Sequence, residues 1–132
     1  MTVFYADDDP EDCELFTEAI RQIDPEMKTI LAKDGREALA YLQNTPDIPD
    51  YIFLDINMPM VDGKRCLIEI KKTLKFRNTP VIMYSTTSDT NEIKEYYRLG
   101  AHDFLIKPNN FATLCESLES IFNLTRSRGA IF

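Results

Sequence analysis

Polar side chains follow directly after four short apolar runs of the sequence. They are Asp7, Asp8, Asp9, Asp55, Ser85 and Lys107. Crowded carboxylates cannot all stay ionised cheaply without a cation, and a hard divalent ion with oxygen ligands relieves their repulsion. Mg²⁺ fits best, because it takes one or two protein carboxylates and completes its shell with water and phosphate. The set therefore predicts phosphoryl chemistry, in which one carboxylate acts as nucleophile and forms an aspartyl phosphate.

The elements that must position these residues alternate between short apolar runs and longer segments of helical period. The runs expected to form strands are 3–6, 29–32, 51–54, 80–84 and 104–106. This alternation is typical of an α/β fold, a doubly wound five-stranded parallel sheet with helices on both faces. In such a sheet ligands bind outside the carboxyl ends of the strands, so the polar residues are expected to meet at one edge.

Most of these residues also have an ordinary structural explanation, which fits Asp7 and Asp8 less well because they precede the helix cap and end an apolar strand. Asp9 and Asp12 suit a helix start, where a cap and acidic side chains in the first turn are stabilising. Asp55, taken alone, more often begins a turn, and Ser85 and Lys107 alone are ordinary loop and surface residues. Their joint position at strand ends favours a site.

The composition of the chain limits the classes of partner that it is expected to bind. The 132 residues carry a formal net charge of −7, and the first 20 hold seven acids and no Lys or Arg, so the excess charge lies on the first strand end and first helix. This charge disfavours nucleic acid and membrane surfaces and favours cations or a basic protein face. Cys13, Cys66 and Cys115 lack disulfide or zinc spacing and indicate a reducing compartment, so a cytoplasmic protein is expected.

Two features that the sequence lacks limit the kinds of molecule that could donate the phosphoryl group. With four glycines, the chain has no glycine-rich phosphate loop, so a nucleotide is not the expected donor. His102 is the only histidine and precedes the fifth strand, at the edge opposite the acids. Any phosphohistidine must therefore come from another protein.

Four segments together resemble the receiver domain of two-component response regulators. They are Tyr-Ala-Asp-Asp-Asp-Pro at 5–10, Phe-Leu-Asp-Ile-Asn-Met-Pro-Met-Val-Asp-Gly at 53–63, Val-Ile-Met-Tyr-Ser-Thr at 81–86 and Phe-Leu-Ile-Lys-Pro at 104–108. They occur in the family's order and spacing. The resemblance implies a chemotaxis-type single-domain receiver with the flavodoxin-like strand order 2-1-3-4-5. A receiver domain over 1–124 and a frayed tail over 125–132 are expected.

The same resemblance implies roles for individual residues. Asp55 would be the phosphoacceptor. Asp8 and Asp55, with the backbone carbonyl of Asn57, would hold Mg²⁺, and Asp7 would assist through water. Lys107 would pair with the phosphoryl group.

Three further positions concern the switch. Ser85 would move to the phosphoryl oxygen, and the rotamer of Phe104 would follow that movement. The Lys107–Pro108 bond resembles the cis peptide of the family.

The expected function is a stand-alone response regulator that accepts a phosphoryl group from a sensor histidine kinase or histidine phosphotransfer protein. It would switch a surface that binds an unknown downstream protein and would not be a turnover enzyme. One alternative is a receiver-like binding module that is never phosphorylated. The other is a Mg²⁺-dependent phosphatase resembling the haloacid dehalogenase family, suggested by Asp7 and Asp9. The chain is short for that family, and its only aspartates between 81 and 106, Asp89 and Asp103, are far apart.

Overall fold

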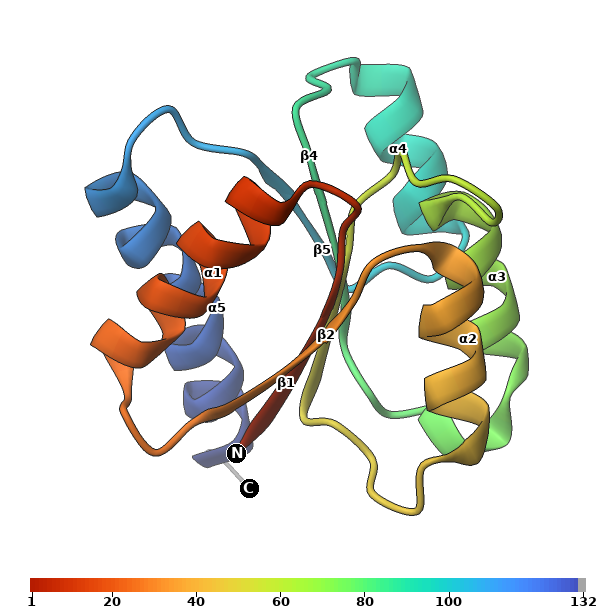
Figure 1. Cartoon of the computed structure of the whole chain (residues 1–132), viewed down its shortest axis with the longest axis horizontal. Helices are drawn as coiled ribbons and strands as arrows, with labels where there is room; N and C mark the ends of the chain where they lie inside the picture. The colour runs from red at the N-terminus through yellow and green to blue at the C-terminus, as the bar shows by residue number, and fades with distance from the viewer. Residues whose placement is uncertain (131–132) are drawn as a thin grey trace.

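A parallel five-stranded sheet runs through the middle of the molecule (Figure 1). The computed structural model describes the backbone of residues 1–130 and the side chains of residues 1–123. The strands are β1 (Thr2–Ala6), β2 (Lys28–Ala32), β3 (Tyr51–Leu54), β4 (Val81–Ser85) and β5 (Asp103–Ile106). Their order is β2-β1-β3-β4-β5, and all pairs are parallel, which confirms the predicted fold class and strand order.

Helices cover both faces of this sheet. They are α1 (Pro10–Ile23), α2 (Gly35–Asn44), α3 (Gly63–Lys72), α4 (Thr90–Arg98) and α5 (Phe111–Ala130), with a short 3₁₀ turn η1 (Leu74–Phe76). Figure 1 shows α1 and α5 on one face and α2, α3 and α4 on the other. Phe16 of α1 and Phe53 of β3 pack in the first of two cores, while Phe4 of β1 and Leu67 of α3 pack in the second. The central strands are buried on both faces, as parallel sheets require.

Four helices begin at an aspartate near the carboxyl edge of the sheet. Asp9, Asp34, Asp62 and Asp89 are the N-caps of α1, α2, α3 and α4, and each side chain accepts a backbone N–H from the first turn. These bonds satisfy donors that a helix start leaves unpaired. Each of the loops that follow β1, β2, β3 and β4 therefore ends at an aspartate cap, which holds the start of the next helix near the strand ends.

The C-terminal helix differs from the sequence-based expectation. The backbone of α5 is helical to Ala130, whereas the sequence predicts a frayed tail from residue 125. No proline follows Pro108, and no glycine precedes Gly129 in this segment, so the sequence contains no early stop signal. Residues 131–132 of the expected tail lie outside the described residues. The domain boundary at 124 stays a prediction.

Within the described residues, no helix is long and apolar enough to cross a membrane.

Candidate functional site

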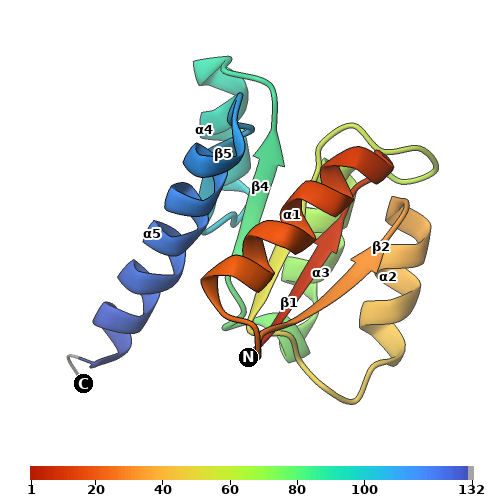
Figure 2. The same ribbon diagram turned by 60° about the vertical axis from the view of Figure 1, so that its left-hand side comes forward.

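The strand registers bring the predicted site residues to one edge. Ala6 pairs with Leu54, so Asp7 and Asp55 leave neighbouring strands at the same level. The backbone N–H of Asp55 donates to Ala6 O at 2.9 Å, and the N–H of Lys107 donates to Ser85 O at 2.8 Å. Figure 2 shows the strand arrows running to this common edge. Segments separated by up to 100 residues thus meet because parallel strands end together.

Three carboxylates form an acidic cluster at this edge. Oxygen atoms of Asp7, Asp8 and Asp55 all lie within 4.8 Å of one another. Asp7 and Asp55 are buried, with 1% and 6% of their surface exposed, while Asp8 is exposed. An oxygen-only donor set with one open side suits a hard divalent cation that keeps several waters. The residues present therefore fit a Mg²⁺-type ion.

Asp7 is held by contacts that leave its carboxylate little freedom. Its Oδ1 accepts the backbone N–H of Asp9 at 3.0 Å. Its Oδ2 accepts the ammonium of Lys107 at 2.9 Å and also the hydroxyl of Tyr5, which lies in the core. Burial and the nearby Asp7 charge raise the pKa of Tyr5 far above its ordinary value, so Tyr5 stays protonated as a donor. The Asp7 carboxylate is thus held in one orientation by three donors.

Lys107 is the cation of the site. Its Nζ lies 2.8 Å from Asp12 Oδ2, 2.9 Å from Asp7 Oδ2 and 3.4 Å from Asp55 Oδ1. The ammonium also lies 5.3 Å from the centre of the Tyr84 ring. Burial lowers the pKa of Lys107, but the hydrogen bonds that its ammonium donates to Asp12 and Asp7, together with the charge of Asp55, outweigh this and raise the pKa above its ordinary value. Lys107 is therefore a permanent positive charge beside the acidic cluster.

The burial of Asp55 and the charges around it shift the pKa of its carboxyl group. Burial raises its pKa, the charge of Asp7 raises it further, and Lys107 lowers it, with a net pKa of about 6. Because the value stays below neutral pH, Asp55 is an anionic, partly desolvated carboxylate in the metal-free protein. A nearby cation would stabilise the charge of such a carboxylate, and the carboxylate is available as a nucleophile.

Ser85 is the last residue of β4 and is 1% exposed, so it is a buried strand residue and not an ordinary loop residue. Its hydroxyl oxygen accepts the N–H of Thr87 at 3.4 Å. The Thr87 hydroxyl in turn donates to Glu92 of α4 at 3.3 Å. The β4–α4 loop is therefore linked to the first turn of α4 by side-chain hydrogen bonds.

Phe104 is half-buried in β5. Its ring centre lies 5.9 Å from that of Tyr96, and Tyr96 is buried, which favours ordinary packing for this tyrosine. Tyr97 is 44% exposed, and its hydroxyl donates to Asp103 at 3.0 Å and accepts the N–H of Phe104 at 3.1 Å. Phe104, the aromatic residue predicted for the switch, thus contacts α4 in two ways. Its ring packs near that of Tyr96, and its backbone N–H donates to the hydroxyl of Tyr97.

Two residues of the site were not identified from the sequence. Asp12 was explained as a first-turn acid, although its carboxylate makes the shortest contact of Lys107. Tyr5 belongs to an apolar strand run and showed no sign of a polar role. The one available signal was spacing, because Tyr5 and Asp7 are two apart on a strand and so face the same side.

The family model described as the response regulator receiver domain matches residues 3–119. The chain belongs to this family. The receiver is 28% identical over 125 residues to response regulator Rcp1 of Synechocystis, an alignment that covers 90% of this chain and 84% of Rcp1. It is therefore a receiver domain of two-component signalling.

Solved structures of other receivers share the fold. The phosphorylated cyanobacterial phytochrome response regulator RcpA superposes with a TM-score of 0.83 at 30% identity, covering 91% of this chain and 89% of RcpA. The Mn²⁺-bound form of response regulator Rcp1 superposes with a TM-score of 0.81 at 26% identity, covering 91% of this chain and 90% of Rcp1. Both similarities extend over nearly the whole receiver and not over one motif.

Three further predictions concern Asp9, Asn57 and the peptide bond before Pro108. Asp9 lies outside the acidic cluster and is the N-cap of α1, where its side chain accepts N–H groups of Glu11 and Asp12. Asn57 is exposed in the β3–α3 loop, and its carbonyl as a ligand stays a prediction. The expected cis bond before Pro108 is wrong for this structure, since the described residues contain no cis peptide. Trans is the lower-energy form of an X–Pro bond.

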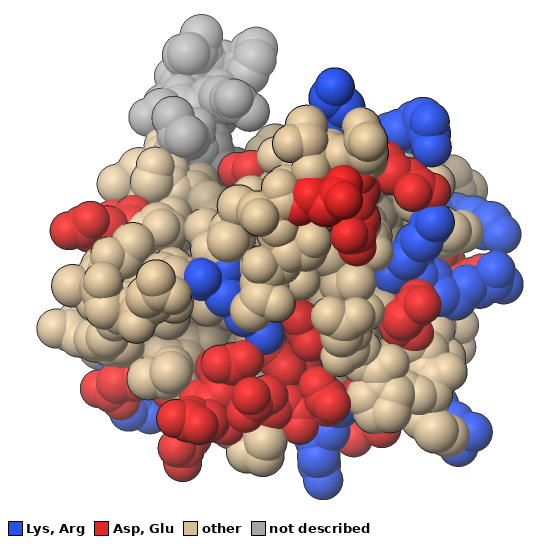
Figure 3. Space-filling view, turned by 90° about the horizontal axis from the view of Figure 1, so that it is seen from above, with Lys and Arg blue, Asp and Glu red and all other residues tan. Residues whose placement is uncertain are grey.

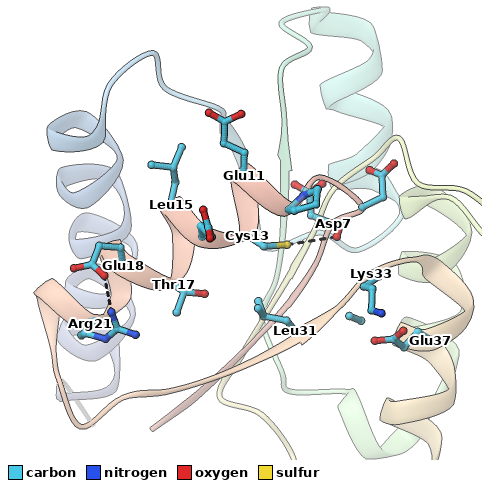
Figure 4. A pocket seen from close by; sticks show the side chains of 14 residues that line it. Asp7, Glu11, Cys13, Leu15, Thr17, Glu18, Arg21, Leu31, Lys33 and Glu37 are labelled. Carbon is cyan, nitrogen blue, oxygen red and sulfur yellow. Dashed lines mark hydrogen bonds and ion pairs between the residues drawn. The ribbon is translucent and has the colours of Figure 1, made fainter.

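The surface around the site is strongly acidic on one side. Figure 3 looks onto the carboxyl edge and shows acidic side chains gathered over part of it. Beside this area, a groove of about 940 Å³ lies between α1 and β2 (Figure 4). Leu15 and Leu31 contribute apolar surface to it and are 44% and 43% exposed, and Glu18 lies at its far end in an ion pair with Arg21. An apolar strip bordered by acids is suited to a protein partner.

Proposed function

We propose that this receiver accepts a phosphoryl group on Asp55 from a phosphohistidine of a sensor histidine kinase or histidine phosphotransfer protein. The observation that carries the proposal is the environment of Asp55. Its carboxylate is buried at a strand end, within 4.8 Å of two further carboxylates and 3.4 Å from the ammonium of Lys107. A desolvated anion between a cation and a divalent-ion site is suited to attack phosphorus.

In the proposed step, an oxygen of Asp55 forms a bond to phosphorus while the bond between phosphorus and the donor imidazole nitrogen breaks. The electron pair of that bond stays on the imidazole. The products are an acyl phosphate on Asp55 and a free histidine on the donor. Lys107 lies 3.4 Å from Asp55, close enough to offset negative charge on the phosphoryl oxygens. Its raised pKa keeps the ammonium protonated.

The residues that would hold Mg²⁺ are Asp8 and Asp55 with the backbone carbonyl of Asn57, assisted by Asp7. When bound, the ion offsets the negative charge that the phosphoryl group brings to the site. The Mn²⁺-bound form of Rcp1 supports a divalent ion in this family. Asp7 is oriented for this task by the bonds from Tyr5 and Asp9.

The output is a change of shape, so the protein acts as a switch and not as a turnover enzyme. A phosphoryl group adds charge and acceptor oxygens. Ser85 would donate its hydroxyl to one of these oxygens, and the loop from Ser85 to Glu92 would carry the change into α4. Phe104 would then change rotamer. The exposed face of α4 and β5, including Tyr97, is the proposed surface for a downstream protein.

The donor protein is proposed to dock beside α1. Leu15 and Leu31 supply an apolar strip, and Glu14 and Glu18 border it, so a basic face with apolar residues would be complementary. Neither nucleic acid nor a lipid surface suits this acidic side. The three cysteines are free, which fits the reducing conditions of the cytoplasm.

The proposal is tested by incubating the protein with acetyl phosphate and Mg²⁺ and measuring intact mass and phosphate release. We expect one added phosphoryl mass in the unmutated protein and none in Asp55→Asn. If the unmutated protein neither gains mass nor hydrolyses the donor, it is a binding module that is not phosphorylated. Turnover that survives Asp55→Asn but is lost in Asp7→Asn would instead identify a phosphatase.

A further inference from the structure

The shortest ion-pair contact of Lys107 is not with the proposed phosphoacceptor. Its ammonium lies 2.8 Å from Asp12 of α1 but 3.4 Å from Asp55. Asp12 is not a member of the three-carboxylate cluster at the strand ends. The ammonium is thus drawn toward the helix and away from the atom that would carry the phosphoryl group.

The position of Asp12 is fixed by the start of α1. Asp9 caps the helix, Pro10 is its first residue, and the N–H of Asp12 donates to Asp9 Oδ1 at 3.4 Å. The side chains of Lys107 and Asp12 are 13% and 29% exposed, so their contact is partly shielded from water. A charge-assisted hydrogen bond of this kind is stronger than an exposed ion pair.

The phosphoryl-bound site would compete with this contact. A phosphoryl group on Asp55 would offer new anionic oxygens to Lys107. To reach them, the ammonium would have to lengthen or give up its bond to Asp12. The energy of that bond therefore opposes phosphorylation and favours the unphosphorylated form.

We propose that Asp12 is a positioning residue that restrains Lys107 and so slows phosphorylation of Asp55. This inference rests on the proposed function, because it concerns the regulation of the same site. The competing explanation is that Asp12 serves only as an acid in the first turn of α1. Glu11 offers the matched comparison, since it lies in the same turn, is exposed and has no ion pair within 4 Å among the described residues.

The experiment compares the unmutated protein with Asp12→Asn, Asp12→Ala and Glu11→Gln at saturating Mg²⁺ over a range of acetyl phosphate concentrations. We expect both Asp12 variants to raise the maximal rate of phosphorylation about three- to tenfold, as loss of a charge-assisted hydrogen bond would. The half-saturating donor concentration should change equally in Asp12→Asn and Glu11→Gln, because each removes one negative charge. Thermal melts verify that the variants are folded.

A second readout does not depend on phosphorylation. The NMR signal of the Lys107 ammonium, in metal-free protein, should shift or broaden in both Asp12 variants and stay unchanged in Glu11→Gln. Equal maximal rates in all variants, or an unchanged Lys107 signal, overturn the inference while leaving the proposed function standing. If the unmutated protein takes up no phosphoryl group, the proposed function fails and this inference fails with it.

Discussion

The ammonium of Lys107 lies 3.4 Å from the carboxylate of Asp55, although 52 residues separate them in the sequence. Two parallel strands that end at the same edge produce this relationship. The contact has a structural consequence as well as a chemical one, since Lys107 is the cation that offsets a group of buried acids. The first prediction follows from that role.

Lys107→Gln should lower the free energy of unfolding of the metal-free protein by about 2–4 kcal/mol at pH 7, because it leaves Asp7 and Asp55 without their cation. Mg²⁺ should recover part of this loss. Urea unfolding with and without Mg²⁺ measures both effects. Lys72→Gln is the control, since its pairing with Glu69 is long, at 3.8 Å, and exposed, and its loss should be below about 0.5 kcal/mol. Similar losses in the two variants would contradict the prediction.

Asp55 should make the stability of the metal-free protein fall as pH rises. Its pKa is about 6 in the folded protein against an ordinary 3.8, so between these values the folded state binds more protons than the unfolded state. Asp55→Asn should therefore stabilise the metal-free protein at pH 7.5 by up to about 3 kcal/mol and change little below pH 4. Urea unfolding across this pH range measures the effect.

The control for this pH dependence is Asp47→Asn. Asp47 is exposed in the loop before β3, at the opposite edge of the sheet. The stability of Asp47→Asn should depend on pH in the same way as that of the unmutated protein. A profile for Asp55→Asn that runs parallel to that of the unmutated protein would show that Asp55 carries no raised pKa.

Tyr5→Phe should cost about 1–3 kcal/mol of stability, because it removes a buried hydrogen bond to the Asp7 carboxylate without changing the ring. Calorimetric or urea unfolding at pH 7 tests this. Tyr41→Phe is the control: Tyr41 is half-buried and stacks on Phe4, and its hydroxyl has no hydrogen bond within the described part of the chain. Equal and small changes in both variants would show that the Tyr5 hydroxyl contributes nothing to the fold.

Gly63→Ala should disturb the site through the backbone. A Cβ at this position would lie 2.2 Å from the carbonyl oxygen of Asp55, so the β3–α3 loop must shift. We expect a loss of about 1–3 kcal/mol and weaker Mg²⁺ binding by titration calorimetry. Gly100→Ala provides the comparison, because its positive φ strains the turn before β5 and its Cβ would meet the side chain of Lys71, not the β3–α3 loop. Mg²⁺ binding weakened equally by both would mean that general loosening, and not the Asp55 backbone, is responsible.

Much of the edge could be predicted from the sequence because it depends on strand ends. Apolar runs locate the strands, and parallel pairing then brings Asp7, Asp55, Ser85 and Lys107 together without further information. The contact between Lys107 and Asp12 could not be predicted, since it depends on the rotation of α1 about its axis. A cap and a helix dipole already explained Asp12 locally, so no unexplained signal remained.

The limits at Tyr5 and at α5 have different physical causes. A tyrosine in a buried strand can satisfy its hydroxyl with many partners, and only the packed core selects Asp7. The sequence predicts a tail from residue 125, whereas the backbone of α5 is helical to Ala130, and no residue before Gly129 interrupts a helix backbone. Hydrophobic pattern located the start of this helix better than its end.

The central claim, that Asp55 takes the phosphoryl group, is tested most directly by locating it on the chain. After reaction with acetyl phosphate and Mg²⁺, borohydride reduction converts a phosphoaspartate into homoserine, and peptide mass spectrometry identifies its position. The account predicts homoserine at position 55 and at no other acid, with none formed when Mg²⁺ is removed. Homoserine at position 7, 8, 9 or 12 instead, or at no position, would contradict it.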